Sequence, residues 1–191
     1  MNNMNITEWC HHFAALQVQP GDLCIDATAG NGHDTLFLAG LTKESGQILS
    51  FDIQEQALFT TQKLLDSCGP FPHVRLILDS HEHLSRYAAP GSVSCITFNL
   101  GYLPGGDHRI ATHASTTIPA VASGLTLLKK GGLMTLCVYR GGDSGFEEYN
   151  SVFSYLKTLD PKKYLVIVSS YYNRPNLPPD AVLIILSLIH I

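Results

Sequence analysis

The sequence predicts a single α/β domain with a Rossmann-like, doubly wound sheet of seven strands. The sheet is expected to be mainly parallel with an antiparallel last strand, and to carry helices on both faces. Two observations support this. Short apolar segments alternate with segments of helical periodicity, as in successive βαβ units. The apolar segments are almost continuously apolar, which is typical of strands buried on both faces. A chain of 191 residues can bury one such core.

The first half of the chain contains four predicted strands and the helices between them. A helix over residues 7–17 is expected to start with Thr7 as its N-cap and to place Trp9, Phe13 and Leu16 on one face. A strand then ends at Asp26, before a glycine turn. The next predicted segments are a helix over 33–41, a strand ending at Asp52, a helix over 54–67, a strand ending near Asp79, a short helix over 81–88 and a fourth strand over 93–100.

The second half completes the predicted sheet. A helix over about 115–128 is expected to end at the "KKGG" of residues 129–132, because cations and glycine favour a helix C-terminus. The later segments are a strand over 133–139, a helix over 146–159 and two strands over 163–172 and 181–186. No helix separates the last two strands, so we expect them to pair antiparallel.

Composition excludes several classes of protein. Apolar residues make up 45% of the chain and charged residues 15%, which excludes a disordered chain and a coiled coil. The first residues lack the features of a signal peptide, and no apolar run approaches the roughly 20 residues of a membrane span. We therefore expect a cytoplasmic protein without membrane contact. The five cysteines form no C-x-x-C pair and the nine histidines lack ligand spacing, so we expect no disulfide and no metal site.

The net charge of −4 disfavours general nucleic-acid binding, which usually needs a basic surface. It is compatible with a local basic rim. Arg109, Arg140 and Arg174 fall in three separate predicted loops and are the candidates for such a rim, with ordinary solvated loop arginines as the alternative.

Acidic residues end the first three predicted strands: Asp26, Asp52 and Asp79. The carboxyl ends of parallel strands meet at one edge of a sheet, where ligands bind. In the turn "DATAGNG", Gly30 and Gly32 let the backbone approach a ligand closely. Asp52 follows Gly32 by 20 residues, a spacing typical of a carboxylate that binds ribose hydroxyls. Asp79 is placed to hold an adenine amino group, so this edge predicts a nucleotide site.

The glycine turn favours S-adenosylmethionine over a dinucleotide. The dinucleotide motif G-x-G-x-x-G needs a third glycine, but Thr35 stands there and Asp34 precedes it. A carboxylate beside the turn disfavours a pyrophosphate and suits a cofactor with a cationic centre and a free amino acid moiety. His33 is expected to contact this cofactor, with capping of the following helix as the alternative.

The fourth strand ends in "FNLGYLPGGDHR", where a buried apolar run gives way to an amide and glycines. We expect Asn99 and the backbone carbonyl groups up to Gly101 to accept hydrogen bonds from a substrate amine. Tyr102 is suited to stack on a flat ring, and Asp107 is a candidate proton acceptor. A turn-forming amide at Asn99 and simple rim packing of Tyr102 are the alternatives.

Several blocks resemble the rRNA methylase family: "DATAGNGHDTLFLA", "FDIQEQAL", "DSHEHL", "FNLGYLPGGDH" and "YNRPNLPP". The resemblance covers about residues 10–185. It implies a class I methyltransferase that takes the methyl group of S-adenosylmethionine to the exocyclic amine of 5-aminomethyl-2-thiouridine, at the wobble position in the tRNA anticodon stem-loop. It also implies that Asn99 to Tyr102 face that amine. The residues that would contact the cofactor on this basis are Asn31, Gly32, Asp52, Gln54, Ser80 and His81.

Other functions remain compatible with the sequence. The low basicity favours a methyltransferase that acts on a small-molecule or protein amine. A nicotinamide-linked oxidoreductase is disfavoured by Asp34 and Thr35, and a non-catalytic nucleotide-binding module is the fourth alternative. A homodimer is also considered.

The final hexapeptide "LSLIHI" matches one reading frame of a DNA end sequence used in transposase-based sequencing libraries. We therefore expect a single domain over residues 1–185 followed by a non-native tail over 186–191. A longer native edge strand is the alternative.

Overall fold

The computed structural model describes residues 5–101, 111–140 and 145–187. Its strands are β1 (Leu23–Asp26), β2 (Gln47–Asp52), β3 (Val74–Leu78), β4 (Val93–Asn99), β5 (Leu128–Val138), β6 (Tyr164–Ser169) and β7 (Asp180–Leu186). Its helices are α1 (Ile6–Gln17), α2 (His33–Thr42), α3 (Glu55–Cys68), the 3₁₀ helix η1 (His81–Arg86), α4 (Ala114–Leu127) and α5 (Gly145–Leu156). These elements confirm the α/β class and the predicted order of strands and helices.

The seven strands form one sheet in the order β3-β2-β1-β4-β5-β7-β6. Strands β1 to β5 pair in parallel, whereas β7 runs antiparallel to both β5 and β6, as expected from the missing helix between the last two strands. Successive strands first progress from β1 to β3 on one side and then from β4 outward on the other. The order therefore reverses between β1 and β4, where doubly wound sheets bind ligands at the carboxyl edge.

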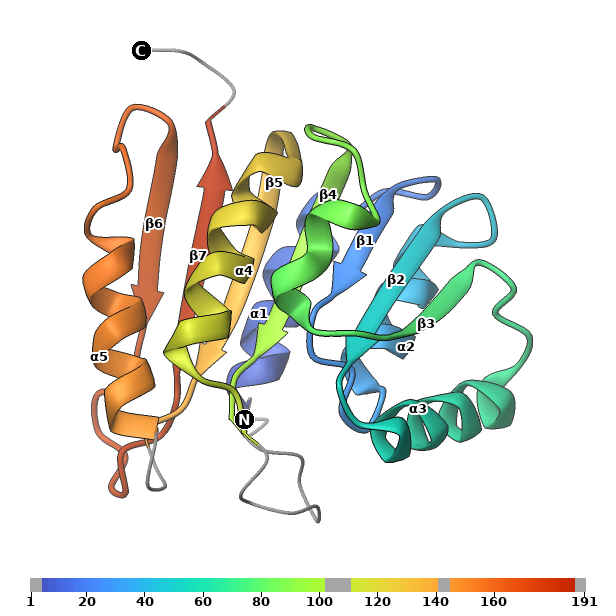
Figure 1. Cartoon of the computed structure of the whole chain (residues 1–191), viewed down its shortest axis with the longest axis horizontal. Coiled ribbons are helices and arrows are strands. Elements are labelled where there is room, and N and C mark those ends of the chain that lie inside the picture. Colours follow the sequence, from blue (N-terminus) through green and yellow to red (C-terminus); the bar gives the residue numbers. More distant parts are fainter. Residues whose placement is uncertain (1–4, 102–110, 141–144, 188–191) are drawn as a thin grey trace.

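Helices cover both faces of this sheet (Figure 1). On one face α1 and α2 pack on the central strands, and α3 lies beside α2 against β2 and β3. On the other face η1, α4 and α5 form a continuous layer. Each face has its own buried cluster, which includes Leu38 and Leu183 on the α1–α2 side and Leu84 and Val152 on the other. The apolar strands are thus buried from both sides.

The N-cap of α1 is Asn5, so the prediction of Thr7 is wrong. The Glu8 N–H donates to Asn5 Oδ1, and the Asn5 N–H donates to Glu8 Oε2, each at 2.8 Å. This reciprocal capping box satisfies two backbone donors at the helix start. Thr7 lies inside the first turn of the helix, so it is not the residue that precedes it.

The "KKGG" segment belongs to β5 and does not cap a helix. Helix α4 ends at Leu127, and Leu128 already pairs with Val93 of β4. Lys129 Nζ lies 2.6 Å from Asp22 Oδ1, an ion pair that draws this segment toward the start of β1. Strand pairing and a tertiary ion pair therefore override the local helix-end signal.

The end of the described chain is paired. Leu186 lies opposite Tyr164, and the Ser187 N–H donates to the Lys163 carbonyl at 2.8 Å. The remainder of the predicted non-native tail lies outside the described residues, and that assignment stays a prediction. No helix in the described part of the chain has the length and apolar character that a bilayer span requires.

Replacing Asn5 by Ala should lower the free energy of unfolding by about 1 kcal/mol, because the Glu8 N–H loses its acceptor. For a chain of this size we expect a fall in Tm of about 2–4 °C in thermal unfolding. Asn5→Asp keeps an acceptor oxygen and should retain most of the stability. An Asn5→Ala protein with the Tm of the wild type would contradict the assigned cap.

Candidate active site

The turn between β1 and α2 is hydrogen-bonded to the end of β2. The Gly30 N–H donates to Asp52 Oδ2 at 3.0 Å, and the Ala29 N–H donates to the Phe51 carbonyl at 2.8 Å. Gly30 and Gly32 both have positive φ, at 53° and 84°. Two residues in the left-handed region make the chain reverse tightly beside Asp52, so the acidic end of β2 and the glycine turn form one surface.

Gly32 is required at its position. A Cβ there would lie 2.9 Å from Thr61 Cα, which is backbone of α3 and cannot rotate away. Gly32 is also the N-cap of α2 and makes no side-chain cap. The first N–H groups of α2 therefore lack a side-chain acceptor from the cap, and a helix start of this kind attracts an anionic group such as a carboxylate.

Asp26 lies at the end of β1 and is fully buried. Its Oδ2 accepts from the Thr35 hydroxyl at 2.6 Å, and its Oδ1 accepts from the Thr28 N–H at 3.1 Å. Burial raises the pKa of Asp26 to about 7, and the negative charge of Asp34 adds to the increase. A carboxyl group held in this state would gain its full charge when a cation binds nearby.

Asp34, in the first turn of α2, is nearly buried and is paired with a histidine. His11 Nε2 of α1 lies 2.6 Å from Asp34 Oδ1, and the His11 ring stacks on Phe37 with 3.8 Å between centroids. Asp34, the acid beside the glycine turn, thus joins α2 to α1 through His11. Sequence analysis did not single out His11, because nothing in a helical histidine indicates a partner 23 residues away.

Asp52 is half-buried at the end of β2, and each oxygen accepts one backbone N–H. Gly30 donates to Oδ2, and Gln54, the N-cap of α3, donates to Oδ1 at 2.9 Å. A carboxylate oxygen has two lone pairs, so each can accept one further bond. The pair of vicinal hydroxyls of a ribose matches this capacity.

Asp79 lies just beyond β3, and its carboxylate is held by its own neighbours. Oδ1 accepts from the Ser80 N–H and lies 2.7 Å from His83 Nδ1, while Oδ2 accepts from the Tyr87 hydroxyl at 2.8 Å. The hydrogen bonds from His83 and Tyr87 lower the pKa of Asp79 to about 2. The carboxylate is therefore ionised at neutral pH and shapes the turn into η1. Its predicted contact with adenine stays a prediction.

His81, the first residue of η1, is buried against the Phe98 ring, and Ser80 caps the same helix. Burial lowers the pKa of His81, although a hydrogen bond with the Ala27 backbone opposes the shift. Its Nε2 has no hydrogen-bond partner among the described residues. A buried imidazole nitrogen without a partner is uncommon, and a polar group of a ligand at this edge of the sheet could satisfy it.

Asn31 is half-buried in the glycine turn, and His33 is exposed at the start of α2. Because Gly32 is the N-cap and no side chain caps α2, the alternative in which His33 caps this helix does not hold. The predicted ligand contacts of both residues stay predictions.

The end of β4 is joined to the glycine turn. The Asn99 N–H donates to the Thr28 hydroxyl at 2.7 Å, and Asn99 itself is half-buried in register with Cys137 of β5. Gly101, with φ of 139°, lies two residues further on. The structure thus brings the predicted substrate residue Asn99 next to the predicted cofactor turn, and Gly101 follows after Leu100. Tyr102, Asp107 and Arg109 lie outside the described residues.

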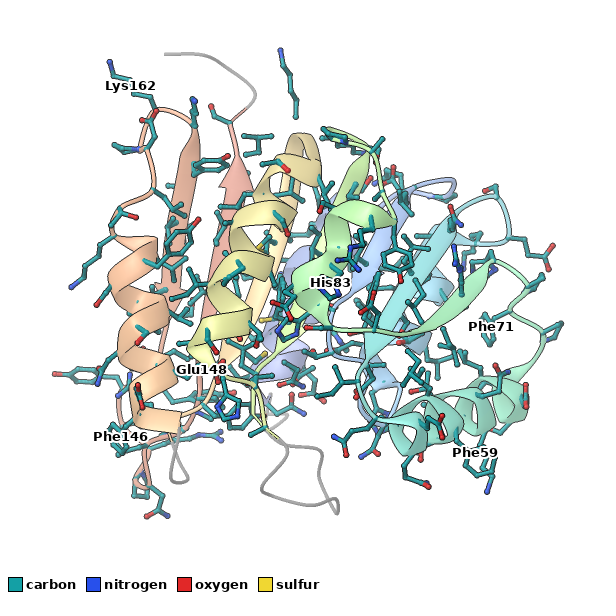
Figure 2. The ribbon with its side chains drawn as sticks, in the orientation of Figure 1. Phe59, Phe71, His83, Phe146, Glu148 and Lys162 are labelled. Carbon is teal, nitrogen blue, oxygen red and sulfur yellow. The ribbon has the colours of Figure 1, made fainter. Side chains whose placement is uncertain are left out.

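Three groups of functional side chains, one within the glycine turn and two beyond it, were not found from the sequence. Thr28 links β1 to β4. Glu148 of α5 is buried and accepts from the hydroxyls of Thr112 and Thr117 at 2.7 and 2.6 Å (Figure 2). Asp180 is buried at the start of β7 and accepts from the Tyr149 hydroxyl at 2.6 Å and from the Arg140 guanidinium. Single threonine and acidic residues carry no signal in the sequence for contacts with such distant partners.

Two of the expected rim arginines already have partners. Arg140 pairs with Asp180 and lies over the Tyr149 ring, and Arg174 lies over the Tyr171 ring at 4.3 Å from its centroid. Both stand on the β5–β7–β6 side of the carboxyl edge. A guanidinium stacked on an aromatic ring still has N–H groups at its edges, so this arrangement is compatible with a phosphate rim.

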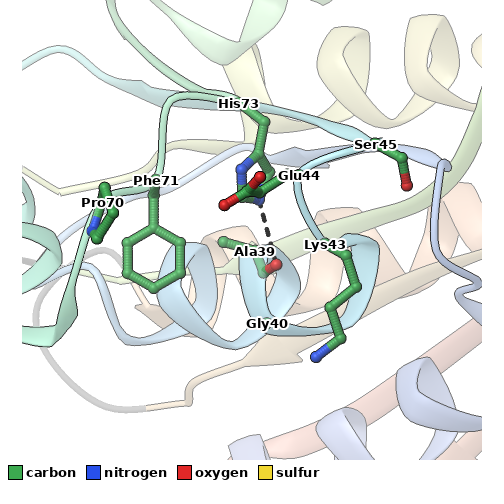
Figure 3. A pocket seen from close by; sticks show the side chains of 8 residues that line it. All are labelled: Ala39, Gly40, Lys43, Glu44, Ser45, Pro70, Phe71 and His73. Atoms are coloured by element: carbon green, nitrogen blue, oxygen red, sulfur yellow. Dashed lines mark hydrogen bonds between the residues drawn. The ribbon is translucent and has the colours of Figure 1, made fainter.

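A cavity of about 500 Å³ lies away from this edge, between the C-terminal end of α2 and the residues before β3 (Figure 3). His73 Nε2 contacts the Ala39 carbonyl there at 3.2 Å, and Phe71 forms one wall. The cavity is at the amino ends of β2 and β3 and includes none of the predicted site residues. Within the described ranges, no three His, Cys, Asp or Glu side chains gather as a metal site would require.

Comparison with known proteins finds similar sequences that are named as methyltransferases. Residues 48–185 match the model of the family described as "Putative rRNA methylase". A curated relative, the chloroplastic tRNA (mnm(5)s(2)U34)-methyltransferase of Arabidopsis thaliana, is 34% identical over 181 residues. The alignment covers 90% of this chain but only 66% of that relative, so the chain spans about two thirds of its length.

Solved structures show the same fold. A putative rRNA methylase of Clostridium thermocellum is 41% identical with a TM-score of 0.94, over 97% of this chain and 100% of that one. SMU.1697c, a putative methyltransferase of Streptococcus mutans in complex with SAH, is 34% identical with a TM-score of 0.87, over 95% of this chain and 98% of that one. The architecture described above is therefore shared along almost the whole chain.

Substitution of Gly32 by Ala should destabilise the protein by at least about 1–2 kcal/mol, because an L-residue is strained at this φ and its Cβ would strike the backbone of α3. Gly40 of the same helix provides the control. A Cβ there meets nothing within 4 Å, so Gly40→Ala should stabilise by roughly 0.5–1 kcal/mol. Denaturant unfolding measures both, and two variants of equal stability would refute the assigned turn.

Asp26→Asn should gain stability relative to the wild type as the pH rises from about 4 to about 7. The folded pKa of Asp26 is about 7, above the unfolded value near 3.9. The folded wild type therefore keeps a proton that the unfolded chain has released. Its stability falls with rising pH between about 4 and 7 and levels off above that window.

The asparagine variant lacks this titration. Its carbonyl oxygen can still accept from the Thr28 N–H, and its amide nitrogen can donate to Thr35 Oγ1. Chemical unfolding at a series of pH values measures the difference. A stability gap that stays constant over this window would show that the pKa of Asp26 is not raised.

Proposed function

Because the chain belongs to the putative rRNA methylase family, we propose that it transfers a methyl group from S-adenosylmethionine to an amine. We further propose that the amine is the exocyclic one of 5-aminomethyl-2-thiouridine at the wobble position of tRNA. One arrangement carries the proposal. The turn after β1 contacts Asp52 on one side, through Gly30, and Asn99 on the other, through Thr28. A donor held by the turn and Asp52 would lie next to a substrate held at Asn99.

The residues present fit S-adenosylmethionine. Asp52 keeps lone pairs for the two ribose hydroxyls, and the uncapped start of α2 suits the carboxylate of the amino acid moiety. Asp26 carries a carboxyl group near its titration point, which suits the ammonium or the sulfonium charge. The buried Nε2 of His81, which has no partner among the described residues, could bond a polar group of the cofactor. We propose that the predicted residues of the turn and of the three strand ends line this site.

When bound, S-adenosylmethionine supplies an electrophilic methyl group on a positively charged sulfur. The chain has to present a neutral nitrogen to that methyl group. The amide oxygen of Asn99 and the carbonyl groups up to Gly101 can accept N–H bonds from the amine and direct its lone pair. Holding two reactants in this way contributes about 7–11 kcal/mol to lowering the barrier. Deprotonating an amine whose pKa is near 10 costs roughly 4–5 kcal/mol at neutral pH, which the acceptors do not remove.

Exposed aromatic side chains support an RNA substrate. Tyr139 follows β5, Phe146 begins α5 and Tyr172 follows β6, and all three lie toward the carboxyl edge, with 41%, 53% and 103% of their surface exposed. Figure 2 shows Phe146 at the same end of α5 as Glu148. Unpaired bases of a loop stack on such rings, and the wobble base belongs to a single-stranded loop. The name of the Arabidopsis relative supports the same substrate.

The net charge of −4 favours the second candidate, a methyltransferase for a small-molecule or protein amine. Salt dependence separates the two. Binding to tRNA should weaken steeply with salt because counterions are released, whereas a small amine shows little such dependence.

The test is nucleoside analysis of tRNA carrying 5-aminomethyl-2-thiouridine after incubation with a labelled methyl donor. We expect the label in the methylated aminomethyl nucleoside. Asn99→Ala should lower kcat about 10- to 100-fold, because the amine loses an acceptor, while affinity for S-adenosylhomocysteine measured by calorimetry stays within about twofold.

Gln62→Ala is the matched control, since Gln62 is an exposed amide on α3 whose side chain bonds to Asp66 of the same helix. It should leave turnover unchanged. Labelling of a small amine or a protein, with none in tRNA, would overturn the tRNA proposal. Full activity of Asn99→Ala would overturn the role of that side chain.

A further inference from the structure

We propose that Glu148 is a positioning residue for methyl transfer: acting through the Thr112 hydroxyl, it holds the backbone of Gly101 at the end of β4. This inference rests on the proposed function, because Gly101 adjoins the proposed acceptors of the substrate amine. Glu148 belongs to α5 and is 49 residues away from Asn99 along the chain. It touches neither the proposed donor site nor Asn99, so it would act only through other residues.

A continuous series of hydrogen bonds connects α5 to β4. Thr117 of α4 donates to Glu148 Oε1 at 2.6 Å, and Thr112 donates to Glu148 Oε2 at 2.7 Å. The Thr112 oxygen then accepts from the Gly101 N–H at 2.8 Å. A second bond, from the Thr112 N–H to the Gly101 carbonyl at 2.9 Å, closes the pair.

The chemistry of a carboxylate gives this series a direction. An ionised carboxylate only accepts hydrogen bonds, so both threonine hydroxyls must point their protons at Glu148. The Thr112 oxygen then turns a lone pair away from Glu148, and the Gly101 N–H uses it. Glu148 is 5% exposed, so water does not compete for these positions. The carboxylate therefore locks a hydroxyl that would otherwise rotate.

The position of Gly101 matters because it follows the reacting edge directly. Its φ of 139° is accessible to glycine and disfavoured for other residues, and the preceding Leu100 is held by its N–H to the Cys137 carbonyl at 2.9 Å. Leu100 is bonded to β5 and Gly101 is bonded to Thr112. These bonds restrict the directions in which the carbonyl groups from Asn99 to Gly101 can point. A displacement of 1 Å in such a group can cost about 100-fold in rate.

A purely structural role for Glu148 would be to join α4 to α5. The two roles use different bonds and can be separated. Thr117→Val removes the bond between Glu148 and α4 but leaves the bonds through Thr112 to Gly101. Thr112→Val removes the hydroxyl that links Glu148 to the Gly101 N–H. It leaves the backbone bond to the Gly101 carbonyl and the bond between Glu148 and Thr117. Both changes replace a hydroxyl by a methyl group of similar size, so packing is nearly conserved.

The experiment measures kcat and KM on tRNA, affinity for S-adenosylhomocysteine, Tm and hydrogen exchange of the Gly101 amide by NMR in full-length variants. We expect Thr112→Val to lower kcat at least 10-fold, to leave the affinity for S-adenosylhomocysteine within about twofold, and to speed exchange of the Gly101 amide. Thr117→Val should lose a similar amount of Tm but keep kcat within about threefold and leave that exchange slow. Thr112→Ser restores the hydroxyl and should restore kcat.

Glu148→Leu should lower kcat as Thr112→Val does. A variant that carries both substitutions should have a kcat no lower than that of the slower single variant. If Glu148→Leu does not fold, the comparison of Thr112→Val with Thr117→Val still tests the positioning role. Equal kcat losses in Thr112→Val and Thr117→Val, or slow Gly101 exchange in Thr112→Val, would overturn the positioning role. A wild type that binds S-adenosylhomocysteine but methylates no tRNA would refute the proposed function, and the exchange of the Gly101 amide would still test the link to Gly101.

Discussion

The turn after β1 is bonded on both sides, and the rest of the candidate site depends on this constraint. On the β2 side, the Gly30 N–H reaches the Asp52 carboxylate, and on the β4 side the Thr28 hydroxyl receives the Asn99 N–H. The strand order makes this geometry available, because β1 lies between β2 and β4 at the point where the order reverses. A turn with fewer glycines could not bend to both neighbours, since Gly30 and Gly32 adopt positive φ and Gly32 contacts α3.

The acidic side chains around this turn differ in their surroundings. Burial raises the pKa of Asp26, while hydrogen bonds from His83 and Tyr87 lower that of Asp79. Asp34 has His11 as a partner, and Asp52 shares its oxygens with two backbone N–H groups. The result is an edge of the sheet where four acidic side chains lie close together, and the half-buried Asp52 keeps lone pairs for a ligand. This pattern is complementary to a ligand with a cationic centre and a ribose, which agrees with the family to which the chain belongs.

Two buried carboxylates lie on the side of the edge proposed for the substrate. Glu148 of α5 accepts from two threonine hydroxyls, and Asp180 at the start of β7 accepts from Arg140 and Tyr149. Burying a carboxylate costs free energy unless hydrogen-bond donors pair with it. The donors around Glu148 and Asp180 offset this cost and hold both side chains in place. Glu148 connects to the end of β4, and Asp180 connects to Arg140 and Tyr149 beside the exposed aromatic residues. Under the proposed function, α2 and α3 frame the side of the methyl donor, and α4 and α5 support the side of the methyl acceptor.

The sequence by itself determined the features that depend on local pattern. The alternation of apolar strands and helices predicted the sheet, and the positions of Asp26, Asp52 and Asn99 at strand ends predicted one edge with all three residues, because parallel strands bring their carboxyl ends together. Local signals failed where a distant partner decided the outcome, as at "KKGG", which joined β5 once Leu128 met Val93. The tertiary structure alone decided the pairing of His11 with Asp34, of Thr28 with Asn99 and of Glu148 with Thr112. Each of these contacts joins residues that are far apart in the chain, and its strength comes from burial, which exists only after the chain has folded.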